Sequence, residues 1–183
     1  MRSRRAAIAA TTLLAATASG CSILIGNVKP SSEKSESYAV MDLTREKPPW
    51  ARVAQEEGAG DGETEGDRSD VAYQSPKTAS IISLNSSCGQ DAQDEPDLRA
   101  LTNLVLLGIT AETSRDEREI KAAGLPALET TVKGELGGEP MMLRTVVLRN
   151  ESCSFDLMYV SRPGHFVAEE PVFSSFVSSL RVQ

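Results

Sequence analysis

Few residues of this chain could carry out chemistry: it has three cysteines and a single histidine, His165. Cys153 and His165 could serve as a nucleophile and its base. Such a pair also needs an orienting acid and an activating motif, and the sequence contains no G-x-S-x-G element. The histidine lies in the sequence RPGHF, which is typical of a surface turn. We therefore expect no catalytic residue and no enzyme activity.

Sequence patterns for metals and cofactors are also missing. The chain has no Cys-x-x-Cys pair, no zinc-ligand spacing and no phosphate-binding loop. Met141 and Met142 are expected in a strand core, because no further methionine or histidine clusters with them to hold copper. The acidic pair Glu169–Glu170 is explained by the preference for negative charge at the start of a helix. We predict no metal and no cofactor.

The first 20 residues have the three parts of a secretory signal. Residues 1–5 carry three arginines and no acid, and residues 6–18 carry no charge. This uncharged run of 13 residues is shorter than the roughly 20 apolar residues that a membrane-spanning helix needs. We expect residues 1–20 to be cleaved as a signal peptide.

Cys21 follows the small residues Ala18, Ser19 and Gly20. This arrangement resembles the lipobox of bacterial lipoproteins, although Ala18 stands where a leucine is usual. The resemblance implies that Cys21 is lipidated and becomes the new N-terminus. The alternative is an ordinary signal peptide cut near Gly20, which leaves a free thiol. No aspartate follows Cys21, so we expect the outer membrane, facing the periplasm, with the inner membrane as the alternative.

Cys88 and Cys153 then remain. Two cysteines in an exported protein form a disulfide more often than two free thiols, because the compartment is oxidising. We predict a structural disulfide between them. It would close a loop of about 65 residues, worth about 4 kcal/mol in the chain-entropy model.

Removal of residues 1–20 leaves 163 residues and a net charge of −10, because three of the 19 basic residues and none of the 26 acidic ones are lost. This acidity argues against nucleic acid as a partner. Residues 21–36 are predicted to be the lipidated cysteine and a flexible tether. Residues 37–183 are predicted to form one α+β domain. The acidic, glycine-rich stretch at 56–70 is expected to be a disordered insertion, since it lacks the ligand order of a calcium loop.

Hydrophobic periodicity predicts the elements of that domain. Strands are expected at 78–88, 128–136, 141–150 and 153–161, with turns at 137–138 and 150–152. In the second of these, Leu128, Thr130 and Val132 are predicted to face the core and Glu129 the solvent. A helix is expected from 96 to about 109, with Leu98, Leu101, Leu104, Val105 and Leu107 or Gly108 at helical spacing on its apolar face. A second helix is expected from Glu169 onward, with a buried stripe of Phe173, Phe176, Val177 and Leu180. YAVMDL, at 38–43, is predicted to be an edge strand, and Trp50 is predicted to close the core.

Several pieces together resemble a known group. They are PPWARV at 48–53, the Gly-x-Pro-Ala turn at 124–127, the hairpin leading to Cys153, and the terminal FSSFVSSLRV. They resemble uncharacterised lipoproteins of the deltaproteobacterial type, whose domain is similar to the PsbP/Mog-like α/β/α sandwich. The resemblance spans roughly residues 37–181, apart from the acidic insertion. It implies an antiparallel sheet with helices packed on it and a place in the cell envelope.

Two functions are compatible with these features. The first is a lipid-anchored, non-enzymatic accessory or assembly subunit, which docks on a protein complex of the envelope and predicts an exposed patch. The second is a periplasm-facing carrier of a small apolar ligand, which predicts a pocket between sheet and helix. Relatives of the resembled fold bind partner proteins, and this favours the first.

Overall fold

The computed structural model describes residues 37–53, 70–88 and 97–183. Its main feature is a seven-stranded sheet in the order β2-β3-β4-β8-β7-β6-β5, with every neighbouring pair antiparallel. A separate two-stranded ladder joins β1 to β9. The strands are β1 (Tyr38–Ala39), β2 (Ala51–Arg52), β3 (Val71–Gln74), β4 (Ile81–Cys88), β5 (Ile109–Ala122), β6 (Leu125–Leu136), β7 (Glu139–Arg149), β8 (Cys153–Ser161) and β9 (Arg181–Val182).

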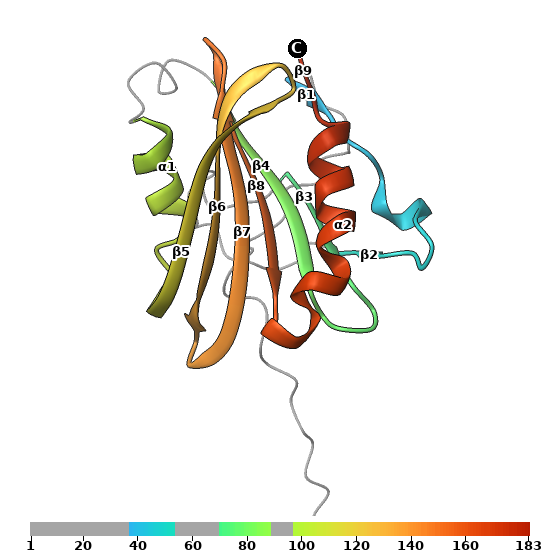
Figure 1. Cartoon of the computed structure of the whole chain (residues 1–183). Coiled ribbons are helices and arrows are strands. Elements are labelled where there is room, and N and C mark those ends of the chain that lie inside the picture. Colours follow the sequence, from blue (N-terminus) through green and yellow to red (C-terminus); the bar gives the residue numbers. More distant parts are fainter. Residues whose placement is uncertain (1–36, 54–69, 89–96) are drawn as a thin grey trace, which may run out of the picture.

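Two helices cover opposite faces of this sheet, so the predicted α+β fold with an α/β/α layering is confirmed (Figure 1). Helix α1 (Leu98–Val105) lies against β6 and β7, and α2 (Pro163–Ser179) lies against β7 and β8. A short 3₁₀ turn, η1 (Leu43–Arg45), precedes β2. Among the described residues, none of the helices has the length and apolar content needed to cross a bilayer.

The larger core lies between α2 and the sheet. Tyr159 stacks on Phe166 and Phe173 of α2, with ring centroids 4.9 and 5.8 Å away. Tyr73 meets Phe176 edge-on at 6.1 Å. These rings are buried, and aromatic pairs of this kind contribute about 0.5–1.5 kcal/mol each beyond their buried area. Trp50 is also buried in this core, as predicted.

The central hairpins follow the sequence prediction closely. β7 and β8 lie at the predicted places, and Gly137–Gly138 joins β6 to β7 with both residues at positive φ. This conformation is the one that a two-residue hairpin turn requires and that glycine adopts without strain. The same geometry recurs at Ala123–Gly124, which joins β5 to β6.

Helix α2 begins six residues before the predicted Glu169. Pro163 occupies its first turn, where a missing N–H does no harm, and Pro171 lies inside the helix. The prediction was wrong because Pro163–Gly164 was interpreted as a turn and Pro171 as a helix start. Packing of Phe166 on Tyr159 extends the helix instead, against an interior-proline penalty of about 3 kcal/mol.

Three further predictions need correction. The helix expected up to about 109 ends at Val105, because β5 begins at Ile109. The YAVMDL segment contributes β1 and the first residue of η1, and β1 pairs with β9 and not with the edge of the main sheet. Glu129 was expected in solvent but is 5% exposed, because α2 covers that face and two arginines accompany the carboxylate.

Candidate functional site

A disulfide joins Cys88 to Cys153, which face each other across β4 and β8 with their Cα atoms 4.1 Å apart. The predicted pairing is confirmed. Cys153 therefore cannot be a free nucleophile, and the alternative pairing with His165 is wrong. Cys153 and His165 are also separated by the length of β8. Cys153 is the first residue of the strand, and His165 lies in the first turn of α2, which follows the strand.

Glu169 on α2 fastens the β3–β4 hairpin to the helix. Its two carboxylate oxygens accept hydrogen bonds from the hydroxyls of Ser75, at 2.6 Å, and Thr78, at 2.7 Å. Burial raises the pKa of Glu169, but hydroxyl donors from Ser75, Ser80 and Thr78 outweigh it, so that the pKa lies below its ordinary value. This carboxylate is therefore an ionised structural clamp.

A second carboxylate lies beneath α2. The buried Glu129 of β6 accepts a 2.9 Å hydrogen bond from Nε of Arg144 on β7 and also pairs with Arg118 of β5. Arg144 in turn donates to Glu170 at 2.5 Å and lies over the ring of Phe173. Both members of the predicted acidic pair, Glu169 and Glu170, thus hold α2 to the sheet from the middle of the helix.

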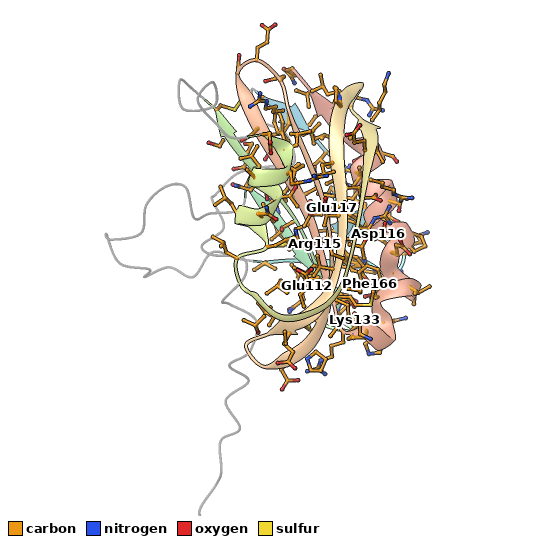
Figure 2. The ribbon with its side chains drawn as sticks, turned by 60° about the vertical axis from the view of Figure 1, so that its left-hand side comes forward. Glu112, Arg115, Asp116, Glu117, Lys133 and Phe166 are labelled. Atoms are coloured by element: carbon orange, nitrogen blue, oxygen red, sulfur yellow. A yellow bond between two sulfur atoms is a disulfide. The ribbon has the colours of Figure 1, made fainter. Side chains whose placement is uncertain are left out.

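On the opposite face of the sheet, charged side chains of β5 form hydrogen bonds and ion pairs with polar residues of α1. Arg115 donates to Glu112 at 2.9 Å and to Oδ1 of Asn103 on α1 at 2.8 Å. Glu117 pairs with Arg115, and both are labelled in Figure 2. Glu117 also pairs with Arg99 of α1. The hydrogen bond to Glu112 is the largest cause that raises the pKa of Arg115. Sequence reasoning missed these residues, because β5 lacks the apolar alternation that indicates a strand.

A cleft of about 780 Å³ opens between the start of α1 and the β5–β6 hairpin. Its lining combines apolar residues with four charged side chains. The lining residues are Asp97, Leu98, Arg99, Glu119, Ile120, Lys121, Pro126, Ala127 and Leu128. Its place between sheet and helix is the one that the carrier hypothesis expects, but its lining is partly charged.

Two leucines at the C-terminal end of α1 are exposed to solvent. Leu104 is 56% exposed and Leu107, just past the last turn, is 76% exposed. The helical spacing predicted Leu104, and Leu107 or Gly108, on the apolar face of this helix. The buried residues here are Thr102 and Leu106, and the helix ends at Val105, so that Leu107 lies beyond it. We call the cleft and these two leucines together the α1 surface.

Other predicted features lie outside the described residues. These are the signal peptide, Cys21, the tether and nearly all of the acidic insertion. Within the described ranges, no group of three or more histidine, cysteine, aspartate or glutamate side chains is placed to hold a metal ion.

No protein-family model matches the chain, and no curated protein matches its sequence. Among solved structures, LpqN of Mycobacterium tuberculosis, described as involved in cell envelope biogenesis, is similar with a TM-score of 0.51 at 8% identity. That match covers 85% of this chain and 86% of LpqN, and it shows a shared fold. The cyanobacterial PsbP of Synechocystis gives a TM-score of 0.49 at 14% identity, over 85% of this chain and 98% of that one.

Proposed function

We propose that this protein is a lipid-anchored, non-enzymatic accessory subunit of the bacterial cell envelope. An acylated Cys21 holds it at a membrane, with the outer membrane as the expected place, and its folded part docks on a partner protein through the α1 surface. The anchor is supported by the signal-like pattern of residues 1–20 and the cysteine that follows it. The fold shared with LpqN, which is described as involved in cell envelope biogenesis, supports this proposal.

The observation that carries the docking proposal is the exposure of Leu104 and Leu107. Leu104 lies in the last turn of α1 and Leu107 in the turn that follows it, so both exposed leucines are at the C-terminal end of this helix. Leucines of this kind stabilise an association when a partner covers them, by about 25 cal/mol per Å² of apolar surface removed from water. The charged pairs around Arg99 and Arg115 would form the polar rim of such an interface.

The side chains most suited to chemistry have structural roles, which supports a non-enzymatic assignment. Cys153 is in a disulfide, Glu169 clamps the β3–β4 hairpin, and Glu170 pairs with Arg144. Each of these groups would have to leave its present partner before it could act on a substrate.

Two measurements test the proposal. The first is the intact mass of the protein from its own membranes: residues 21–183 plus acyl groups are expected, and an unacylated soluble chain would exclude the anchor. The second places a photo-crosslinking residue at 107 or, as a matched control, at Val167, which is 75% exposed on α2. A discrete adduct is expected from position 107 only, and it should be lost with Leu104→Asp. Equal labelling at both positions would contradict docking through α1.

A carrier of a small apolar ligand is the second candidate, and the cleft favours it. Its volume falls within the range of about 300–1,000 Å³ that ligand pockets occupy. On the same face of β6 and β7, the buried hydroxyls of Thr130 and Thr145 face each other without a hydrogen-bond partner. A bound ligand would copurify and raise the melting temperature, whereas Leu128→Trp, which fills the cleft, should remove both effects.

A further inference from the structure

β5 is the long free edge of the main sheet. It pairs with β6 on one side, in regular register from Ser114 to Ala122, and with no other described strand. The opposite edge, β2, has only two residues. An exposed edge of this length leaves a row of backbone N–H and C=O groups that another strand can pair with.

The side chains of this edge carry charges of both signs. Seven of the residues from 112 to 121 are charged: Glu112, Arg115, Asp116, Glu117, Arg118, Glu119 and Lys121. An edge that only needs protection is served best by charges of one sign, because two copies then repel each other. β5 instead places acids and bases close together, so its copies are able to attract one another.

We propose that two copies of this protein pair through antiparallel β5 edges, with Glu117 at the two-fold axis. In this register Asp116 faces Arg118 of the second copy, and Arg115 faces Glu119 of the second copy. Two-fold symmetry repeats both contacts, which gives four pairs of opposite charge across the new ladder. Directly opposed charges of opposite sign stabilise strand pairing, and like charges destabilise it.

Neighbouring registers bring fewer pairs of opposite charge together. Centring the pair on Arg118 would place Arg118 against itself and Glu117 against Glu119 of the second copy, so like charges would meet. Centring it on Asp116 or Glu119 would leave only two favourable charged pairs. The charge sequence of β5 therefore selects one alignment, as a self-complementary interface must.

The proposed register has one contact between like charges, Glu117 against Glu117. Each of these carboxylates is already compensated within its own chain, by Arg99 at 3.1 Å and Arg115 at 3.4 Å. Asp116 and Glu119 have no side-chain hydrogen bond or ion pair within the described parts of the chain. They are available to a second copy without breaking an existing contact. Arg118 is 61% exposed and keeps further donors beyond its pair with Glu129.

Cysteine crosslinking of the full-length protein in its membranes tests this register. Glu117→Cys should give a disulfide-linked dimer on mild oxidation, because only residue 117 faces its own copy. Glu119→Cys is the matched control, since residue 119 faces 115 and lies far from its own copy along the strand. Equal crosslinking of the two variants, or none for Glu117→Cys, would overturn the proposal.

Charge reversal provides a second test that does not depend on new thiols. Asp116→Lys would set lysine against Arg118 twice, and the dimer should dissociate at concentrations at least tenfold higher in sedimentation experiments. Glu151→Lys, in the exposed β7–β8 turn, makes the same change in net charge and should leave the dimer intact. A wild-type protein that stays monomeric up to its solubility limit would refute the pairing. This inference does not rest on the proposed docking through α1, whose leucines are unchanged in all of these variants.

Discussion

Gly134 of β6 lies so close to Ile109 of β5 that a β-carbon at residue 134 would stand 2.8 Å from the Cγ2 atom of that isoleucine. It would also lie 2.8 Å from the carbonyl oxygen of Thr110. At this point the β5–β6 register shifts, between Thr110 and Ser114, and Ala111 adopts a positive φ. A glycine is therefore required where the irregular start of β5 crosses β6.

We expect Gly134→Ala to lower the free energy of unfolding by about 1–3 kcal/mol, because a backbone oxygen cannot move aside as a flexible side chain would. Urea unfolding followed by circular dichroism measures this. Gly164→Ala is the matched control, since a β-carbon there meets no atom within 4 Å. It should be neutral or stabilise α2 by up to about 1 kcal/mol. Equal effects of the two substitutions would show that β5 and β6 are not in close contact at this point.

The disulfide should contribute much of the stability. The paired replacement Cys88→Ser with Cys153→Ala is expected to reduce the free energy of unfolding by about 4 kcal/mol, because the reduced chain regains the entropy of a loop of 65 residues. Chemical denaturation with and without reductant measures the loss. Reductant should have no further effect on the variant, and a variant as stable as the wild type would contradict a structural role.

Glu169 should make stability depend on pH in the acidic range. Its folded-state pKa lies below 4.5, so the stabilisation is fully present above pH 4.5 and is lost as the pH falls through the lower folded value. Glu169→Gln is expected to cost about 1–2 kcal/mol at neutral pH, since the hydroxyls of Ser75 and Thr78 lose a charged acceptor. The variant should also lose less stability on acidification.

Melting temperatures recorded from pH 7 to pH 3 distinguish these outcomes. Glu151→Gln, in an exposed turn, is the control and should follow the wild-type curve. If Glu169→Gln and wild type lose stability in parallel below pH 4.5, the clamp does not account for the acid sensitivity.

The ion pair under α2 should show strong coupling. Arg144→Met is expected to cost about 3 kcal/mol, because the buried carboxylate of Glu129 is then left with the exposed Arg118 alone. Combining it with Glu129→Leu should cost less than that single change, since no unpaired charge stays buried. A double-mutant cycle by urea unfolding measures the coupling, and additive effects would show that the two groups act independently.

The strands from β6 to β8 could be predicted because alternation, two turn signals and the second cysteine agree with one another. β5 could not, since both of its faces carry charges and its edge is open, so no apolar period indicates a strand. Its place comes from the Ala123–Gly124 turn, which pairs it with β6. The start of α2 depends on the contact between Phe166 and Tyr159, which no local pattern contains.

The candidate site was predictable only in part. Cys88 and Cys153 could be paired from their number and their compartment. The exposure of Leu107 could not be predicted, because a helical period does not reveal where the helix ends. Leu104 is exposed inside the helix, although the same period placed it on the apolar face. The burial of Glu129 depends on arginines from two other strands. Which residues of those strands lie beside Glu129 is set by the strand register, and the sequence alone does not give that register.

The ladder between β1 and β9 determines how the protein responds to force. The first described residue is Ser37. Strand β1 follows it and is held by a few hydrogen bonds to β9, the short strand after α2. A pull applied from the N-terminal side would load this short ladder first, together with the buried ring of Tyr38, which meets Phe155 of β8 edge-on at 6.4 Å. The ladder and this aromatic contact would therefore resist the pull together, ahead of the hydrogen bonds of the seven-stranded sheet.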